Sequence, residues 1–172
     1  LQVELRPDSG GMAVTDTVAV AEPVAQFEFV LNAGFSVETE TGLLTPLQHS
    51  RDGTRIAYRV VPPQPAKELK LRFSGQPRFS GRRSMGGMPQ GEVGTDGVYL
   101  DAASAWYPLF DGPVTAMTLD IDLPEGWESL GIGQRSDHGD RQRWVSTQPH
   151  DSLYLLAAPY RRYATQHDGV EL

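Results

Sequence analysis

The segment GVYLDAASAWYPLFDGP, residues 97–113, and its continuation VTAMTLDIDLPEGW, residues 114–127, decide the fold class of this chain. In the continuation, apolar and polar residues alternate in the order Met117, Thr118, Leu119, Asp120, Ile121, Asp122, Leu123. A period of two residues is typical of a β-strand with one buried face, and the Pro-Glu-Gly sequence that follows predicts a turn. The first segment combines small residues, an aromatic pair and a proline, which predicts a loop with one short helical turn near Ala102–Trp106.

Short alternating segments recur along the rest of the chain, separated by residues that favour turns. They cover residues 1–6, 12–20, 27–31, 35–43, 56–60, 69–73, 144–145 and 153–163. Helical periodicity is not found over any comparable length. We therefore predict an all-β fold, a β-sandwich of about ten short and mostly antiparallel strands, in a single domain of residues 1–172.

Composition excludes several classes of function. The net charge of −7 disfavours nucleic acid as a partner, because phosphate binding relies on clustered Lys and Arg. The absence of cysteine excludes disulfides and thiolate metal sites, but it fits the cytoplasm and the bacterial envelope equally well. No apolar run approaches the ~20 residues that span a bilayer, so we expect no membrane span in this segment.

Residues 76–96 interrupt the strand pattern with repeated Gly and Pro and with three arginines, Arg78, Arg82 and Arg83. A loop of this length is either functional or flexible. The segment is interpreted as a flexible surface loop, with contact to a groove or to another domain as the functional alternative.

No complete catalytic or metal-binding motif is found. The four histidines, His49, His138, His150 and His167, are never four residues apart, so the His-Glu-x-x-His arrangement of zinc peptidases is absent. The sequence Asp137-His138-Gly139-Asp140 is interpreted as a turn. We therefore predict no metal ligands and no catalytic residues, and the chain by itself is not expected to be an enzyme.

The aromatic residues Trp106, Tyr107, Trp127 and Trp144 allow two interpretations. They form a platform on which a sugar stacks, because aromatic rings present flat apolar faces, or they belong to the core of the sandwich.

Several stretches, taken in order, resemble the non-catalytic N-terminal β-domain of M1-family zinc aminopeptidases. They are Leu1–Gly11, Phe27–Val37, Gly97–Trp127, Ala157–Tyr160 and His167–Leu172. This resemblance implies a saddle-like β-sandwich that precedes a thermolysin-like catalytic domain. It also implies that the chain is an excised N-terminal domain, whose partner is the catalytic domain of the same protein and whose zinc lies in that missing domain.

The resemblance also suggests which residues meet a peptide substrate. Family members place a Gln or Glu shortly before the aromatic-Pro loop, where it holds the free amine of the substrate. Here the matching stretch is Gly97-Val98-Tyr99-Leu100-Asp101, so Tyr99 or Asp101 takes that place, with Ser104 nearby. Trp106 and Tyr107 are further contact candidates. The Ser104–Pro108 stretch resembles divergent M1-like proteins of bacterial envelopes, which favours the envelope slightly.

Two other functions stay open at this stage. The chain is a free-standing β-sandwich module that binds glycan or protein, or it is a structural module between domains without ligand contact. The functional prediction is a non-catalytic domain that packs on a metallopeptidase catalytic domain and caps its peptide cleft.

Overall fold

A computed structural model describes residues 1–80, 91–112, 114–137, 139 and 141–161, together with the backbone of 166–167 and 170–171. Strands and two short 3₁₀ helices make up its regular structure. The strands are β1 Gln2–Arg6, β2 Gly11–Val24, β3 Phe27–Asn32, β4 Phe35–Thr39, β5 Leu43–His49, β6 Arg55–Val61, β7 Ala66–Gly75, β8 Gly91–Gly94, β9 Gly97–Leu100, β10 Met117–Asp122, β11 Glu128–Leu130, β12 Gln134–Arg135, β13 Gln142–Ser146, β14 Leu155–Ala158, β15 Gln166–His167 and β16 Val170–Glu171. The 3₁₀ helices are η1 Pro7–Ser9 and η2 Ala102–Ser104.

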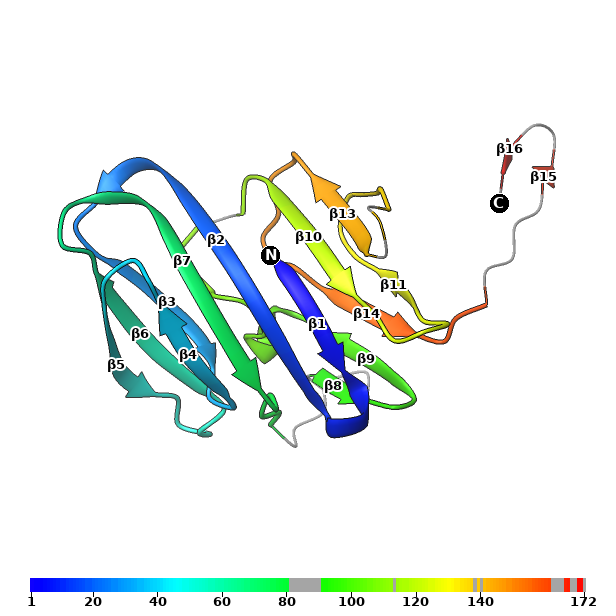
Figure 1. Cartoon of the computed structure of the whole chain (residues 1–172), viewed down its shortest axis with the longest axis horizontal. Helices are drawn as coiled ribbons and strands as arrows, with labels where there is room; N and C mark the ends of the chain where they lie inside the picture. Colours follow the sequence, from blue (N-terminus) through cyan, green and yellow to red (C-terminus); the bar gives the residue numbers. More distant parts are fainter. Residues whose placement is uncertain are drawn as a thin grey trace.

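Seven strands form the large sheet, in the order β12-β13-β10-β1-β2-β7-β4 (Figure 1). Its centre is the pair β1 and β2, joined through η1, with β7 antiparallel to β2 over most of the length of both. The contact of β1 with β10 is parallel, whereas the other neighbours in this sheet are antiparallel. The two strands that pair in parallel are more than 100 residues apart in the chain, so this pairing is a long-range contact.

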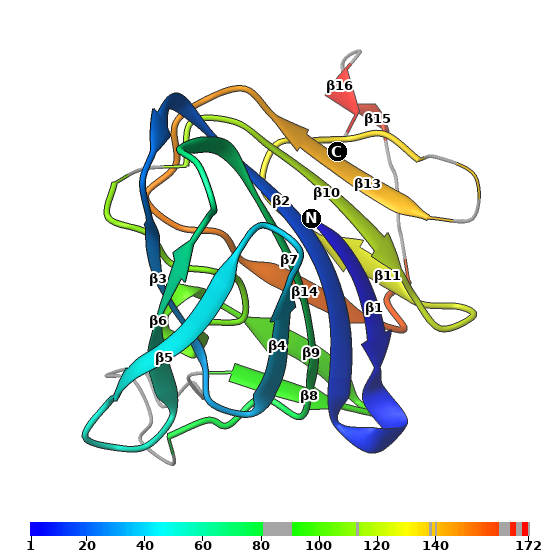
Figure 2. The ribbon, with the colours of Figure 1, turned by 60° about the vertical axis from the view of Figure 1, so that its left-hand side comes forward.

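Two smaller sheets lie along one face of the large sheet (Figures 1 and 2). The four-stranded sheet has the order β11-β14-β9-β8, and the three-stranded sheet has the order β3-β6-β5. The inner side chains of all three sheets belong to one hydrophobic cluster. This is the layered arrangement of a β-sandwich, in which each sheet buries one face against the other.

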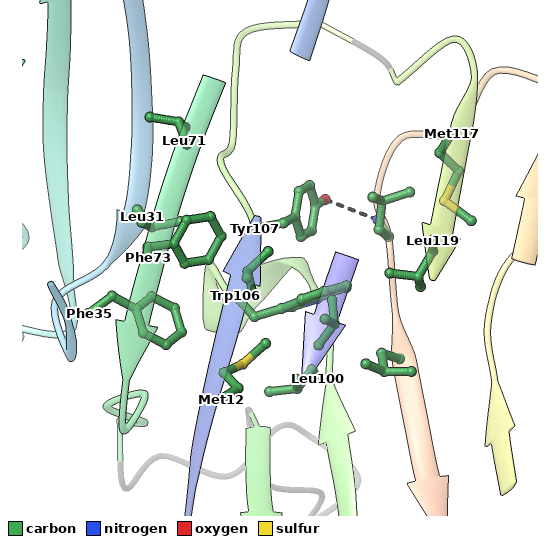
Figure 3. Close-up of a cluster of buried hydrophobic side chains, with 14 of the residues drawn as sticks. Met12, Leu31, Phe35, Leu71, Phe73, Leu100, Trp106, Tyr107, Met117 and Leu119 are labelled. Carbon is green, nitrogen blue, oxygen red and sulfur yellow. Dashed lines mark hydrogen bonds between the residues drawn. The ribbon is translucent and has the colours of Figure 1, made fainter. Parts of the chain in front are cut away.

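Trp106 lies among the buried side chains between the sheets, next to Met12, Leu100 and Tyr107 (Figure 3). Its indole is fully buried, and its ring meets that of Tyr107 edge to face at a centroid distance of 5.2 Å. Such aromatic pairs add stabilisation beyond the area that they bury. The aromatic-Pro loop thus fills the centre of the sandwich rather than its surface.

The turn between β3 and β4 moves the chain from the three-stranded sheet to the large sheet. A Cβ atom on Gly34 in this turn would lie 1.9 Å from the main-chain oxygen of Gln76. Only glycine therefore allows the turn to pack against the segment that follows β7.

The all-β fold predicted from the sequence is confirmed, and its pairing is mostly antiparallel, as expected. The predicted strand Met117–Leu123 is β10, and the predicted helical turn near Ala102–Trp106 is η2. The structure has more strands than the ten or so predicted, because several are only two residues long. In the part of the chain that the structure describes, no helix is long and apolar enough to cross a membrane.

Residues 76–96, predicted as one loop, include a strand. Gly91–Gly94 forms β8 and pairs with Gly97–Leu100. The alternation that identifies strands is missing because glycine occupies both ends of β8. Residues 81–90, with Arg82 and Arg83, lie outside the described residues, whereas Arg78 is described and exposed.

Substitutions at two neighbouring positions of β10 are expected to differ sharply in how much they destabilise the fold. Leu119 is fully buried between the sheets, whereas the Thr118 side chain is exposed on the opposite face. Leu119→Ala is expected to lower the free energy of unfolding by about 3 kcal/mol, because it leaves a cavity in a packed core. Thr118→Ala is the matched control and should cost less than about 1 kcal/mol. Urea denaturation of the two variants measures the difference, and equal losses would contradict this description of the core.

Candidate functional site

The site begins where β9 ends and the chain turns into η2. Asp101 is the N-cap of η2, with extended backbone angles, and its Oδ1 accepts a hydrogen bond from the Ser104 N–H at 3.2 Å. The Ser104 hydroxyl donates to the Asp101 carbonyl at 2.6 Å. An Asp cap of this kind satisfies a main-chain N–H that the first helical turn leaves without a partner. Asp101 is thereby held in one orientation at the end of the strand.

Tyr99 and Asp101 lie side by side. The Tyr99 hydroxyl donates to Oδ2 of Asp101 at 3.4 Å, and both side chains are half-buried. Partial burial, together with the negative charge of Asp101, raises the pKa of the Tyr99 phenol, so that Tyr99 stays protonated and keeps donating. One carboxylate oxygen thus serves the η2 cap and the other faces Tyr99.

Ser104 has a different role from the one that the resemblance suggested. Its side chain is buried, and its hydroxyl is engaged within the η2 turn. This geometry assigns Ser104 to holding Asp101, because a buried hydroxyl that already donates to a carbonyl is not presented to a ligand. The structure therefore brings Tyr99, Asp101 and Ser104 together, but only the first two have partly exposed side chains.

Asn32 anchors this turn to the rest of the sandwich. Its fully buried amide donates to the carbonyls of Ser104 at 2.7 Å and of Arg78 at 2.9 Å. Its Oδ1 accepts from the N–H groups of Arg78 at 2.7 Å and of Gly34 at 2.9 Å. The Asn32 N–H also donates to the Ala105 carbonyl at 2.9 Å. Two donor and two acceptor positions of one side chain are thus all used.

The aromatic-Pro loop is fixed on both sides of its buried rings. Val30 and Leu109 exchange two main-chain hydrogen bonds of 2.9 Å, which ties the loop to β3. The Tyr107 hydroxyl accepts from the Leu153 N–H at 3.0 Å. Ala105 adopts a left-handed conformation at φ 49°, which turns the chain into the core.

Burial corrects the hypothesis that Trp106 and Tyr107 contact a ligand. Trp106 has an exposed fraction of 0% and Tyr107 of 5%, so neither ring offers a face to a sugar or a peptide. Trp144 is buried as well, and its indole N–H donates to Ser129 at 2.9 Å. The sequence could not separate the two interpretations, because a stacking platform and a sandwich core use the same residue types.

The outer face of the four-stranded sheet carries an apolar row that sequence analysis missed. The strand register aligns Leu130, Leu156 and Tyr99 across β11, β14 and β9. Leu130 is half exposed, at 51%, and Glu92 continues the row on β8. The next row of that face includes Ala158 and the Gly94–Gly97 pair, whose small side chains leave the backbone open to close approach. The row is visible only once the register is known.

A separate cleft of about 630 Å³ lies where β2 and β10 diverge. It is lined by Leu1, residues 16–20 of β2, residues 107–112 of the aromatic-Pro loop, residues 114–118, Asp151 and Leu153. Asp16 is buried at its edge, and the amino group of Leu1 is 3.9 Å from the Asp16 carboxylate. Burial raises the pKa of Asp16, while the Leu1 amino group and the Thr17 N–H act in the opposite direction.

The described residues contain no group of three or more His, Asp or Glu side chains that could hold a metal ion. His150 lies instead 2.6 Å from the Ser146 hydroxyl. His138, Asp140 and the side chain of His167 lie outside the described part of the chain. The described residues therefore do not fit a zinc site.

The same architecture is found in parts of several solved structures. An M1 zinc metallopeptidase from Deinococcus radiodurans is similar over 96% of this chain and 42% of its own length, with a TM-score of 0.59 and 18% identity. An aminopeptidase N family protein from Idiomarina loihiensis is similar over 99% of this chain and 31% of its own, with a TM-score of 0.61 and 10% identity. This chain has a fold that M1 zinc metallopeptidases contain. The resemblance inferred from the sequence is thereby confirmed at the level of the fold.

A yeast LTA4 hydrolase in complex with bestatin is also similar, over 96% of this chain and 28% of its own length, with a TM-score of 0.67 and 12% identity. The chain thus spans less than half the length of these M1-like structures. No protein-family model and no curated protein sequence matches it.

The buried amide of Asn32 is expected to be essential for the stability of this region. Asn32→Ala should lower the free energy of unfolding by about 3 kcal/mol or more, because it leaves several buried main-chain groups without partners. Asn32→Asp should also destabilise strongly, since a carboxylate cannot donate to the Ser104 and Arg78 carbonyls. Gln26→Ala, at an exposed amide directly before β3, is the control. Urea denaturation that ranks Asn32→Ala with Gln26→Ala would contradict the role given to Asn32.

Proposed function

We propose that this chain is the N-terminal, non-catalytic domain of an M1-like zinc metallopeptidase, where it packs on the catalytic domain and caps the peptide cleft. The observation that carries the proposal is the extent of the fold match. Nearly all of this chain is similar to M1 metallopeptidase structures, yet it corresponds to less than half of each of them. This difference in coverage is what we expect of one domain of a larger enzyme, in which this domain forms a wall of the peptide cleft and another domain carries the catalytic residues.

The proposal assigns the metal chemistry to the catalytic domain. The described residues offer no cluster that could hold zinc, so in this proposal the catalytic domain provides every zinc ligand. Zinc in such a site would activate a water molecule for peptide hydrolysis. This chain would contribute binding and orientation of the substrate.

The outer face of the four-stranded sheet is the surface that we assign to the catalytic domain. Leu130, Leu156 and Tyr99 form an apolar row there, and Ala158 with the glycine pair allows close approach of another backbone. Apolar rows on an exposed sheet face favour burial against a partner. Tyr99 belongs both to this row and to the pair with Asp101, so a domain docked on the row would lie next to Asp101.

Asp101 is the residue proposed to meet the substrate. Its carboxylate is partly exposed and held by the η2 cap, and a carboxylate forms strong charge-assisted hydrogen bonds with a free ammonium. Tyr99 would orient the carboxylate through its hydroxyl. The substrate class is a peptide with a free amino terminus.

A glycan-binding module receives less support. Trp106, Tyr107 and Trp144 are buried, and among the described residues Trp127 is the one tryptophan with a partly exposed side chain. A location in the bacterial envelope stays a prediction of the sequence.

Substitutions of Asp101 in the longer protein that carries the catalytic domain separate a binding role from a structural one. Asn caps a helix about as well as Asp but has no charge. Asp101→Asn should therefore leave the thermal midpoint within about 1 °C. It should raise KM for an aminoacyl substrate by about tenfold with little change in kcat, because binding to the ammonium is lost equally in the ground and transition states.

The controls are Asp101→Ala, which removes both cap and charge and should also lower stability, and Glu68→Gln, an exposed charge on β7 of the large sheet. Steady-state kinetics and thermal denaturation measure the two effects separately. Unchanged KM in Asp101→Asn, with loss of stability only in Asp101→Ala, would reduce Asp101 to a helix cap and overturn its substrate role.

A further inference from the structure

Two side chains at the end of the three-stranded sheet hold the η2 turn. Asn32 and Arg55 stand opposite each other in the last pair of the β3–β6 ladder. Residues that are directly opposite in an antiparallel pair place their side chains on the same face of the sheet. Asn32 is fully buried at this position, whereas Arg55 is partly exposed. The two side chains therefore reach η2 from one place, but only Arg55 can be changed without opening the core.

Three successive carbonyls at the end of η2 accept hydrogen bonds from this pair. The Arg55 guanidinium donates to the Ala103 carbonyl at 2.5 Å, and the Asn32 amide donates to the Ser104 carbonyl at 2.7 Å. The Asn32 N–H donates to the Ala105 carbonyl at 2.9 Å. The last carbonyls of a helical turn have no partner within the turn, so donors from outside decide how firmly it is held. Arg55 supplies the donor for Ala103, which Asn32 does not reach.

The backbone of Arg55 is fixed where β6 begins. Its N–H donates to the Ser50 hydroxyl at 3.0 Å, and its carbonyl accepts from the Ser50 N–H at 2.9 Å. In the same turn, Asp52 accepts from the Ser50 hydroxyl at 2.7 Å and from the Thr54 hydroxyl at 2.8 Å, which lowers the pKa of Asp52 to about 2. Asp52 is therefore ionised at neutral pH and keeps these bonds, so the Arg55 side chain starts from a fixed position.

The guanidinium of Arg55 is used for this contact rather than for an ion pair. Among the described residues no carboxylate pairs with it, whereas Arg59, further along β6, pairs with Glu28 at 2.8 Å. A guanidinium that donates to a carbonyl forms a charge-assisted hydrogen bond, which is stronger than a bond between neutral groups. This bond joins residues that are 48 positions apart in the chain. Its loss would therefore free one carbonyl of η2 from β6.

One peptide group connects Arg55 to Asp101. The carbonyl oxygen that Arg55 holds and the N–H that donates to Oδ1 of Asp101 at 3.2 Å belong to the same planar unit, between Ala103 and Ser104. Hydrogen bonds in such a chain polarise one another, so a cationic donor on the oxygen strengthens the N–H as a donor. Arg55 thus acts on the Asp101 carboxylate through a single peptide group.

We propose that Arg55 is a positioning residue for Asp101, because it fixes the peptide group that in turn fixes the carboxylate. This inference rests on the proposed function, in which Asp101 binds the free ammonium of a peptide. A carboxylate that is held in place loses less conformational freedom when a ligand binds, so the affinity is higher. Arg55 itself does not touch the substrate, and its contribution depends entirely on Asp101.

Arg55→Met tests the proposal in the longer protein that carries the catalytic domain, because methionine keeps an apolar stem and removes the donor. KM for an aminoacyl substrate should rise about threefold with little change in kcat, since binding is weakened equally in the ground and transition states. The thermal midpoint should stay within about 2 °C, because the side chain is partly exposed. Arg55→Lys keeps a cationic donor, so its KM should stay closer to that of the parent protein. Arg59→Met, at a partly exposed arginine on the same strand, is the matched control.

A double-mutant cycle with Asp101→Asn tests the dependence on the carboxylate. In that background Arg55→Met should leave KM unchanged, because a positioning residue acts through the group that it positions. Equal rises of KM in both backgrounds would mean that Arg55 meets the substrate directly, and the proposal would be wrong. It would also be wrong if Arg55→Met and Arg59→Met had the same KM while Asp101→Asn raised it, although the proposed function would then stand. If Asp101→Asn itself leaves KM unchanged, the proposed function fails and the role of Arg55 in binding fails with it.

Hydrogen exchange of the Ser104 amide, measured in the same protein, follows the connection without any substrate. This N–H donates to Asp101, so Arg55→Met should speed its exchange by at least about fivefold, because the turn then opens more readily. Arg59→Met should leave the exchange unchanged. If Arg55→Met also left it unchanged, the peptide group would not transmit the loss of the guanidinium, and the proposal would fail whatever the kinetics show.

Discussion

The hydrogen bonds of the Asn32 amide are the interaction on which the arrangement of this sandwich depends. A buried amide is stable only when its donors and acceptors all have partners, and those of Asn32 come from three separate parts of the chain. They are the turn after β3, the segment after β7 and the η2 turn. Because one side chain satisfies all of them, the three-stranded sheet, the large sheet and the aromatic-Pro loop have a fixed relation to one another. Displacing any one part would leave unpaired polar groups in the core.

This constraint explains why the candidate site is well defined although it lies on a short turn. Asn32 holds the Ser104 and Ala105 carbonyls, and Ser104 in turn holds Asp101 through its N–H and hydroxyl. The partly exposed carboxylate of Asp101 is therefore connected to the core by two successive sets of hydrogen bonds. A substrate-binding group gains from such a connection, since less conformational freedom is lost when a ligand binds. The same turn directs Trp106 inward, so the position of the carboxylate and the packing of the core have a common origin.

Sequence patterns predicted those features that depend on local periodicity. Alternation identified β10 almost to the residue, and the small residues before Trp106 indicated η2. Strand β8 was missed because glycine gives no alternation, and the parallel pairing of β1 with β10 was not predicted because periodicity does not specify a partner. At the site, Tyr99 and Asp101 were identified from a resemblance. The role of Asn32 could not be, because its partners Arg78 and Ser104 are 46 and 72 residues away in the chain.

The outer face of the four-stranded sheet carries the row of Leu130, Leu156 and Tyr99, because the register of three short strands aligns these residues. Leu130 in this row is 51% exposed. Apolar side chains on an exposed sheet face favour burial against a folded partner. Tyr99 also donates to Asp101, whose carboxylate is held by the η2 turn. A partner that covers the row would therefore lie beside a carboxylate whose orientation is already fixed, so the packing of the sheet and the position of the candidate binding group have a common origin in β9.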